Sequence, residues 1–359
     1  MRFRSPLPAN QMIVLSSRVR YARNLEGFPF PTRLTTTQAK QILSTVSGAF
    51  KGIDSHTRCA LRGSSDSFEA QAFLAEHQIS HEFQDSPLQD ATAYFTFGNQ
   101  HLSAMVNEED HIRLQSIRDG LALTQCLDDI RIADKALADI LPYATSPKWG
   151  YLTACPTNSG TGFRASLMVH LGALTITQNY KVAMMRALED LDLNCRGYFG
   201  EVPSDCEPFL GPVYQISNRK ASGETEEQVI QRITQIANDL TKRELDCRLR
   251  LLNTREGRAT LRAHTLRHLA LAVNQEQYDE RDSALDHLLN LYLPAELGLL
   301  KDITFKDLRQ LATQSEKDRF LRFGECSAPP CSGEALTIQE FFDKRHYRRG
   351  ALSEKVLLS

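Results

Sequence analysis

Arg18 and Arg20 are the first residues in the chain whose type and spacing suggest chemistry. Side chains of an extended segment repeat every two residues, so the two guanidinium groups would lie on one face. Two neighbouring guanidinium groups repel each other unless an anion lies between them, and phosphate matches their planar sets of donors. The segment from Ser16 to Asn24 is therefore a candidate phosphate-binding strand. The alternative is an ordinary strand edge that exposes its arginines to solvent.

A second candidate segment runs from Cys155 to Ser166 and is rich in glycine. Gly160 to Ala165 formally matches the G-x-G-x-x-A pattern of dinucleotide-binding turns, but a single match is weak and no regular βαβ alternation surrounds it. The chain has no G-x-x-x-x-G-K-[ST] sequence, which excludes a P-loop. What remains is a glycine-rich turn at a helix start, where backbone N–H groups approach phosphate near Arg164.

Two further polar segments, Asn107–Arg113 and Arg196–Glu201, place carboxylates close to arginines. Glu108 to His111 directly follow an expected strand, and the alternative for them is a solvated turn. Taken together, all four segments contain arginine, two contain glutamate, and two are rich in glycine. This combination favours one functional site over four separate surface segments.

The elements that must position these residues are mixed in type up to about residue 225. Short β-like runs at 12–15, 93–97, 102–106 and 151–155 alternate with helical patterns at 165–174 and 182–191. Gly98 and Asn99 predict a hairpin between the second and third runs. We therefore predict an α+β fold with a mostly antiparallel sheet flanked by helices.

A helical region follows the mixed one. Thr225 and Gln228 fit a capping box, and apolar residues then recur at helical spacing as far as Leu240. Further helical patterns cover 261–273, 283–293 and 305–313. The expected domains are a catalytic domain at 1–243, which holds all four polar segments, and a helical C-terminal domain at 244–359.

Composition limits the class of protein. The 359 residues carry a net charge of -2, which gives no general electrostatic reason to expect a nucleic-acid or anionic-membrane partner. We expect neither a transmembrane span nor a signal peptide, and hence a cytoplasmic protein. The eight cysteines include no Cys-x-x-Cys pair. They are expected to be reduced thiols, and Cys326 and Cys331 are interpreted as part of a proline-stiffened loop rather than as metal ligands.

The four polar segments resemble, in sequence and in order, the signature motifs of the phosphagen (ATP:guanido) kinases, such as creatine and arginine kinases. Those proteins carry a helical domain ahead of the first motif, whereas here the first motif begins at residue 16 and the helical region comes last. This order, together with Tyr214–Asn218 and Gly223–Ile230, resembles the bacterial protein-arginine kinases of the McsB type. The resemblance extends over essentially the whole chain and is strongest from 13 to 240.

The resemblance implies ATP as phosphoryl donor and arginine side chains of proteins as acceptors. Glu109 and Glu201 match the two catalytic carboxylates, and Cys155 matches the cysteine near the acceptor guanidinium. Mg²⁺ is expected to be held mainly by the nucleotide phosphates, with no dedicated metal ligand in the protein. The residues implied to contact ATP are Ser16, Ser17, Arg18, Val19, Arg20, His77, Arg113, Arg164, Ala165, Ser166, Leu167, Met168, Arg196, Gly197, Tyr198, Phe199, Gly200 and Glu201.

The chemistry of the residues agrees with these assignments. A guanidinium group has a pKa above about 12, so a nitrogen must be oriented and lose a proton before it attacks. Two carboxylates can fix the planar fork, and one can accept the proton. Phosphoryl transfer itself requires mostly alignment and charge neutralisation, which five arginines and Mg²⁺ would supply. A thiolate at Cys155 would add a third negative contact, and the alternative is a small buried residue.

One stretch departs from the resemblance. The related proteins carry Arg-Asp-x-x-Arg-Ala near the C-terminus as an allosteric pocket for phosphoarginine. Here Arg345 and Arg349 remain, while His346 and Gly350 replace the Asp and the Ala. We therefore expect activation by phosphoarginine to be weakened or absent.

The resemblance also implies a homodimer with a role in bacterial protein quality control and the stress response. The implied partners are protein substrates, an activating zinc-finger protein, a heat-shock repressor and the Clp protease. A kinase of free arginine or of another small guanidino compound is one alternative function. A non-catalytic adaptor that binds phosphoarginine is another.

Overall fold

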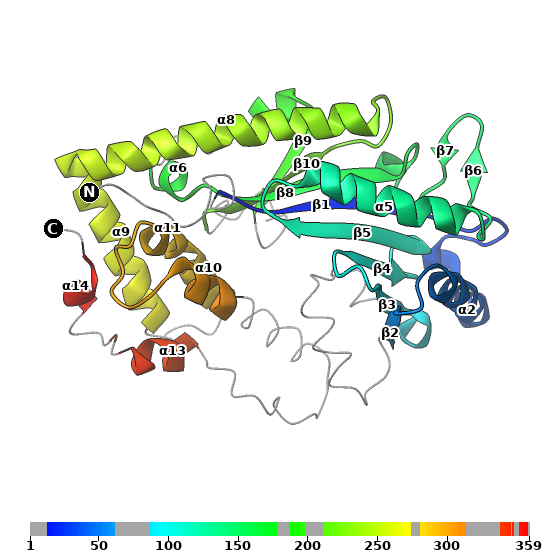
Figure 1. Ribbon diagram of the computed structural model, residues 1–359, viewed down its shortest axis with the longest axis horizontal. Coiled ribbons are helices and arrows are strands. Elements are labelled where there is room, and N and C mark those ends of the chain that lie inside the picture. Colours follow the sequence, from blue (N-terminus) through cyan, green and yellow to red (C-terminus); the bar gives the residue numbers. More distant parts are fainter. Residues whose placement is uncertain are drawn as a thin grey trace. The chain divides into compact units, whose positions relative to one another are not determined.

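The computed structural model describes residues 13–61, 87–177, 187–197, 211–273, 281–312, 338–345, 347 and 352–357 (Figure 1). Contacts divide the chain into two compact units. Unit 1 comprises the described residues within 1–15, 168–216 and 236–359, and unit 2 those within 16–167 and 217–235. These units do not divide the chain at residue 243, and the division into domains at 243 stays a prediction.

A β-sheet forms the framework of the chain, and its strand order is β2-β3-β4-β5-β1-β8-β10-β9. The registered pairs β2–β3, β3–β4, β4–β5 and β5–β1 are all antiparallel. The predicted α+β class with a mostly antiparallel sheet is confirmed. The strands are β1 (Val14–Arg23), β2 (Arg58–Leu61), β3 (Ala93–Thr96), β4 (Leu102–Val106), β5 (Ile112–Asp119), β8 (Phe163–His170), β9 (Leu193–Gly197) and β10 (Val213–Asn218), and a separate pair is β6 (Thr145–Ser146) with β7 (Gly150–Tyr151).

Two helices pack with the sheet in unit 2. Helix α2 (Thr36–Ile53) begins at a complete capping box between Thr35 and Gln38. Its buried face meets the sheet through Phe50, whose ring centroid lies 4.9 Å from that of Phe95 in β3. Helix α5 (Leu123–Ala138) packs against β5 and α2. Three short 3-10 turns, η1 (Pro31–Arg33), η2 (Gln89–Ala91) and η3 (Pro156–Asn158), lie between these elements.

Several predicted elements are confirmed and two are wrong. The hairpin around Gly98 is confirmed, since β3 pairs with β4. The helix predicted at 165–174 is wrong up to His170, because those residues form β8 and only α6 (Gly172–Ile176) is helical. The apolar residues in this stretch fit a period of two as well as a helical period, and sheet pairing decides between them. Only Tyr151 of the strand predicted at 151–155 belongs to a strand.

The helix predicted after Thr225 is confirmed as α8 (Glu226–Asn253). Its capping box is complete: Thr225 N donates to Gln228 Oε1 at 2.9 Å, and Gln228 N donates to Thr225 Oγ1 at 3.2 Å. Further helices are α9 (Arg255–Val273), α10 (Arg281–Asn290), α11 (Tyr292–Glu296), α13 (Ile338–Lys344) and α14 (Leu352–Lys355), and residues 305–312 are also helical. The core of unit 1 is built largely from leucines on these helices, including Leu261, Leu269, Leu288 and Leu308.

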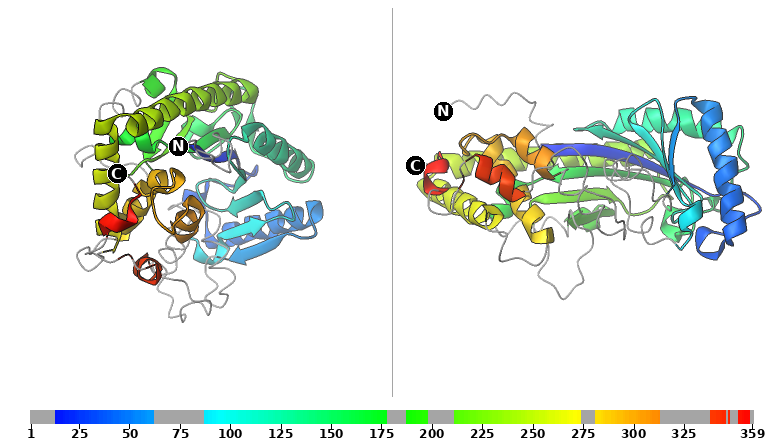
Figure 2. Two further views of the ribbon diagram at one scale, coloured as in Figure 1. Left: turned by 60° about the vertical axis from the view of Figure 1, so that its left-hand side comes forward. Right: turned by 90° about the horizontal axis from the view of Figure 1, so that it is seen from below.

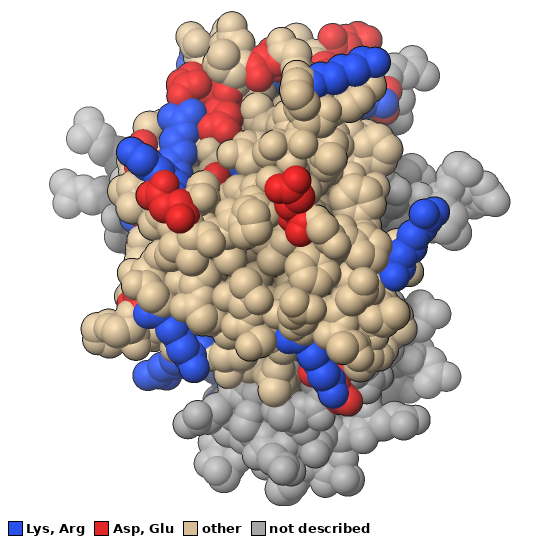
Figure 3. Space-filling model, turned by 90° about the vertical axis from the view of Figure 1, so that its right-hand side faces the viewer, with Lys and Arg blue, Asp and Glu red and all other residues tan. Residues whose placement is uncertain are grey.

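The distribution of charged side chains on the surface agrees with the nearly balanced charge of the chain. On the face shown in Figure 3, the basic and acidic side chains of the described residues are interspersed and separated by wide uncharged areas. None of the described helices combines the length and apolar character needed to cross a membrane.

Candidate active site

Strand β1 presents Arg18 and Arg20 on one face of the sheet in unit 2. Burial alternates along the strand: Ser17 and Val19 are fully buried, whereas Ser16, Arg18 and Arg20 are half-buried. This alternation confirms the shared face predicted for the two arginines. In the neighbouring strand β5, Gln115 lies opposite Arg20, and Arg113 lies opposite Ala22. Residues opposite each other in an antiparallel pair share a face, so Arg113 joins the same face two residues further along.

Three guanidinium groups from three strands of unit 2 influence one another. Burial, followed by the charges of Arg113 and Arg164, lowers the pKa of Arg18 to about 9. Burial and then Arg164 lower the pKa of Arg113 to about 10. Each group is therefore still a cation at neutral pH, and the three cations repel one another. Glu108 opposes this effect at Arg18 and forms an ion pair with Arg113. An arrangement of this kind favours binding of a polyanion between the arginines.

Hydroxyl groups orient two of the three guanidinium groups. Arg18 Nε donates to Ser166 Oγ at 3.4 Å, and Arg164 Nη2 donates to Ser217 Oγ at 3.1 Å. Asn218 follows Ser217 at the end of β10, and its Oδ1 accepts from Ala165 N at 2.9 Å. Strand β8 therefore holds Arg164, Ala165 and Ser166 against the end of β10.

The acidic segment after β4 is largely buried, so the alternative of a solvated turn is wrong for Glu108, Asp110 and His111. Asn107 has a φ of 56°, and its Nδ2 donates to Ala91 O at 2.7 Å and to Ala39 O at 3.0 Å. His111 is buried, and its Nδ1 accepts from Leu25 N at 2.9 Å. Burial lowers the pKa of His111 to about 4, so this imidazole is neutral and structural.

The two glutamates of this segment are placed differently. Glu108 is buried and pairs with Arg113, whereas Glu109 is half-buried. Asp110 is buried and accepts hydrogen bonds from other segments. Among the carboxylates of this loop, Glu109 is thus the one left partly open to solvent, as a carboxylate that contacts a substrate must be.

Asp110 joins three of the four polar segments. Its Oδ1 accepts from Asn24 Nδ2 at 2.6 Å and from Ala154 N at 2.7 Å. Ala154 precedes Cys155, so the backbone beside the cysteine is attached to the residue beside Glu109. Cys155 is a half-buried free thiol whose Sγ lies 3.0 Å from Thr157 Oγ1. The structure therefore connects the Glu109 and Cys155 segments through one carboxylate.

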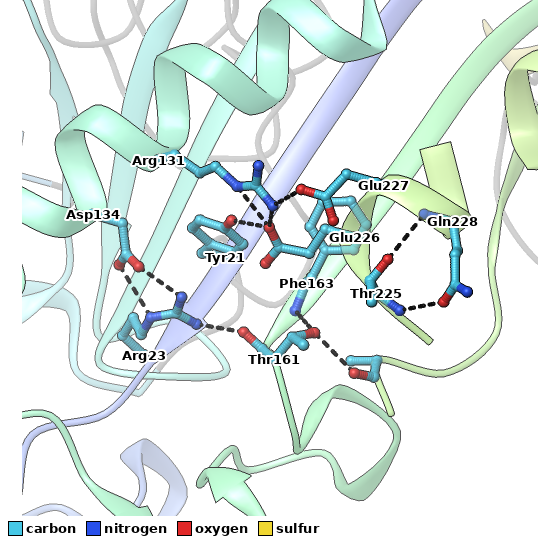
Figure 4. A network of polar contacts seen from close by, with 11 residues as sticks. Tyr21, Arg23, Arg131, Asp134, Thr161, Phe163, Thr225, Glu226, Glu227 and Gln228 are labelled. Carbon is cyan, nitrogen blue, oxygen red and sulfur yellow. Dashed lines mark hydrogen bonds and ion pairs between the residues drawn. The ribbon is translucent and has the colours of Figure 1, made fainter. Parts of the chain in front are cut away.

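Arg23 has a structural role on the opposite face of β1 (Figure 4). Its guanidinium group is buried, and Nε and Nη2 donate to the two carboxylate oxygens of Asp134 at 3.0 and 2.7 Å. Nη1 donates to Thr161 O at 2.9 Å, and the group lies 3.7 Å from the ring centroid of Tyr151. Figure 4 also shows Tyr21 and Arg131 contacting Glu226, which fixes the start of α8 to unit 2.

The glycine-rich segment leads into strand β8, so the predicted turn at a helix start is wrong. Its backbone N–H groups cannot act as a helix N-terminus. Gly162 has a φ of 67°, and a Cβ there would lie 2.5 Å from Ala22 O. Gly162 O in turn accepts from Ala22 N at 2.9 Å. Glycine is thus required because the backbone of this segment lies directly against β1.

Of the remaining sequence-predicted residues, Leu167 is buried in β8 within unit 2, and the others lie in unit 1 or outside the described residues. Met168 is partly buried against the apolar core of unit 1, and Arg196 and Gly197 form the end of β9 in the same unit. Arg345 directly follows α13. Its Nη2 lies 3.4 Å from Asp307 Oδ1, and its guanidinium group lies over the ring of Phe341. The predicted residues His77, Tyr198, Phe199, Gly200, Glu201 and Arg349 lie outside the described residues.

Sequence reasoning missed four residues that shape this site. In the sequence, Glu108 and Asp110 are only members of an acidic run. The residues around them do not distinguish their roles from that of Glu109. Ser217 and Asn218 had a weak signal, because they are two consecutive polar residues after Ile216, at the end of β10.

The chain is similar in sequence and fold to known ATP:guanido phosphotransferases. The model of the ATP:guanido phosphotransferase C-terminal catalytic domain matches residues 38–247. A protein-arginine kinase of Geobacillus thermodenitrificans is 34% identical over 345 residues, covering 95% of this chain and 89% of that protein. A protein-arginine kinase of Clostridium acetobutylicum is 31% identical, covering 85% and 88% of the two chains. The crystal structure of lombricine kinase has the same fold, with a TM-score of 0.55 at 24% identity over 67% of this chain and 69% of that chain.

Proposed function

The chain belongs to the ATP:guanido phosphotransferase family, and we propose that it transfers the γ-phosphoryl group of ATP to arginine side chains of proteins. The observation that carries the protein acceptor is the similarity to protein-arginine kinases over most of both chains. The converging Arg18, Arg113 and Arg164 support the nucleotide part of the proposal, because their mutual repulsion is relieved by an anion.

In this proposal the arginines hold the triphosphate and hinder its movement. Arg18, Arg20, Arg113 and Arg164 would contact phosphate oxygens from strands β1, β5 and β8, and Arg196 completes the set by resemblance to the family. The half-buried positions of Arg18 and Arg20 restrict water around these contacts, which strengthens them. Mg²⁺ bound to the nucleotide would neutralise part of the charge that develops on the phosphates.

The acceptor would be held by carboxylates. Glu109 would contact the guanidinium group, and the hydrogen bond from Ala154 N to the neighbouring Asp110 supports its backbone. Glu201 is proposed as the second carboxylate from the family motif, and Cys155 as a third contact. One of the two glutamates accepts the proton that leaves the attacking nitrogen as the N–P bond forms.

The wider assignments rest on the resemblance to the family. We propose a cytoplasmic homodimer that acts in protein quality control and the stress response, with residues 1–243 as catalytic domain and 244–359 as helical regulatory domain. An activating zinc-finger protein, a heat-shock repressor and the Clp protease are the proposed partners, besides the protein substrates.

The test supplies the purified chain with Mg²⁺ and ATP, together with either an unfolded protein or free arginine. Phosphoarginine is detected by mass spectrometry without acid, because the N–P bond is acid-labile. We expect phosphorylated arginine within the protein, and a loss of about 100-fold or more in rate for Glu109→Gln. Glu189→Gln is the matched control, since Glu189 is an exposed glutamate in unit 1.

Each alternative function predicts a different result. Phosphorylation of free arginine alone would identify a small-guanidine kinase. Binding of phosphoarginine without any transfer would identify an adaptor. An unchanged rate for Glu109→Gln would show that the carboxylate role is misassigned.

A further inference from the structure

Helices α9 and α10 of unit 1 lie side by side (Figures 1 and 2). They bring together three side chains that the proposed kinase mechanism does not use. His268 lies on α9, and Asp286 and His287 lie on α10. One nitrogen or oxygen atom of each residue lies within 4.8 Å of the others, and Asp286 and His287 are buried. Two imidazoles and one carboxylate at this spacing are a typical set of transition-metal ligands.

Two distances within this cluster, His268–Asp286–His287, are close to those between the ligands of a small tetrahedral ion. The two histidine Nδ1 atoms lie 3.3 Å apart, and His287 Nδ1 lies 3.6 Å from Asp286 Oδ2. With metal–nitrogen bonds of about 2.0–2.1 Å, tetrahedral geometry places two nitrogen ligands about 3.3–3.4 Å apart. The Nδ1 atoms therefore already have the separation that such an ion requires.

Charged and polar neighbours surround the cluster. Arg267 acts electrostatically on both His268 and His287, and His264 acts on His268. Asp286 supplies a negative charge that opposes the repulsion between a bound cation and Arg267.

A second layer of contacts orients the carboxylate. Asn290 Nδ2, one turn along α10, donates to Asp286 Oδ2 at 3.3 Å and to the backbone oxygen of Asp286 at 2.9 Å. Gly211 lies against the same carboxylate, because a Cβ at that position would lie 2.7 Å from Asp286 Oδ1. Partners of this kind fix the direction of metal ligands in known sites.

His264 lies beside the cluster on α9, one turn before His268, with 4.4 Å between the two ring centroids, and its Nε2 lies 3.4 Å from Asn290 O. A tetrahedral ion bound by the three converging groups would take water as its fourth ligand.

We propose that His268, Asp286 and His287 form a binding site for a divalent transition metal, with Zn²⁺ as the best match, which links α9 to α10. Mg²⁺ is a poor match because it prefers oxygen ligands in octahedral geometry, whereas two of these three ligands are imidazoles. The proposal contradicts the sequence-based expectation of no metal site in the protein. It is independent of the proposed kinase activity, because it rests on unit 1 alone.

The first test measures metal content in the full chain purified without a polyhistidine tag. After dialysis against Zn²⁺ and then metal-free buffer, we expect about one zinc per chain. His268→Gln and His287→Gln should weaken zinc binding by more than the roughly 10–100-fold that loss of an outer partner costs. His56→Gln is the matched control, because His56 is an exposed histidine that lies next to a carboxylate, that of Asp54. Zinc retained equally by His287→Gln and wild type would overturn the proposal, as would wild type that binds none.

A second measurement uses the wild-type protein, so that it tests the proposal even if the histidine variants do not fold. Co²⁺ added to wild type should give the visible absorption of a tetrahedral site with nitrogen and oxygen ligands, and Zn²⁺ should abolish it by displacement. Zn²⁺ should also raise the Tm of wild type and of His56→Gln, with reversal by a chelator. Octahedral Co²⁺ absorption together with an unchanged Tm in wild type would overturn the proposal without any variant.

Discussion

Asp110 Oδ1 accepts a hydrogen bond from the backbone N–H of Ala154, with 2.7 Å between the two atoms. The same oxygen accepts from Asn24 Nδ2 at 2.6 Å. The buried carboxylate of Asp110, the residue after Glu109, thus connects the segment of Cys155 with Asn24, which directly follows β1. The relative position of Glu109 and Cys155 in unit 2 depends on this contact.

Replacing Asp110 with Ala should therefore lower both stability and activity. Two buried donors lose their acceptor, at a cost of about 1–3 kcal/mol each in free energy of unfolding. The turnover rate should fall further than the loss of folded protein explains, because Glu109 loses its support. Chemical denaturation and phosphorylation assays measure the two effects, and Asp110→Asn, which keeps one acceptor oxygen, should be milder. A change in stability within about 0.5 kcal/mol would show that the contact is unimportant.

Replacing Arg18 with Gln should have opposite effects on ATP binding and on stability. Burial, followed by the charges of Arg113 and Arg164, lowers the pKa of Arg18. Removing this cation ends both its burial and the repulsion, so the ATP-free protein should be as stable as wild type or more so. The affinity for ATP should fall at least about tenfold, or 1.4 kcal/mol, through loss of a phosphate contact. Calorimetric titration with Mg²⁺-ATP and denaturant unfolding check both effects. Arg33→Gln, at an exposed arginine of unit 2, should change neither.

A buried carboxylate in unit 1 should give the protein a pH-dependent stability. Burial raises the pKa of Glu296 from 4.5 to about 7, although Arg248 Nη1 lies 2.7 Å from its Oε2. Because the folded pKa exceeds the unfolded one, the stabilisation is complete below pH 4.5 and is lost as the pH rises through 7. Glu244 also faces this group and raises its pKa. His170, 3.9 Å away, acts in the opposite direction below pH 6.5, because its pKa is held low by burial and by Arg248.

The measurement therefore covers the range from about pH 6.5 to 8, above the region where His170 contributes. The free energy of unfolding of wild type should fall by about 1 kcal/mol more than that of Glu296→Gln over this range. Equal pH dependence in the two proteins would show that Glu296 is not the group responsible.

Phosphoarginine should not stimulate the enzyme. Arg345 already has an acidic neighbour, since its Nη2 lies 3.4 Å from Asp307 Oδ1, and its guanidinium group covers Phe341. Binding of a phosphoryl group there would have to compete with these contacts. We expect the rate of protein phosphorylation to be the same with and without added phosphoarginine. A clear increase would contradict this, and Asp307→Asn would then show whether the ion pair restrains the response.

The sequence predicted the features of this site that depend on neighbours along the chain. The shared face of Arg18 and Arg20 follows from the period of a strand, and the start of α8 follows from the spacing of Thr225 and Gln228. Both depend on interactions within a few residues, and the structure confirms them.

Features that depend on distant contacts could not be predicted in this way. The stretch from Ala165 to His170 fits helix and strand equally, and pairing in the sheet decides for strand. Asp110 and His111 can be buried because Asn24 and Leu25, which directly follow β1, donate hydrogen bonds to them. Similarly, His268 and His287 meet only because α9 packs on α10.

Substitutions of two glycines by alanine should change stability in opposite directions. Gly162 has a φ of 67°, and its Cβ would lie 2.5 Å from Ala22 O, so Gly162→Ala should cost about 2 kcal/mol or more and move β8 away from β1. Gly48 lies inside α2 with nothing within 4 Å of an added Cβ, and Gly48→Ala should stabilise by about 0.5–1 kcal/mol. Denaturant unfolding of both variants gives the two values. Because Gly162 O accepts from Ala22 N on the strand that carries Arg18 and Arg20, Gly162→Ala should also weaken ATP binding, whereas Gly48→Ala should not. A stable Gly162→Ala protein with normal ATP affinity would show that the close approach of the two backbones is not needed.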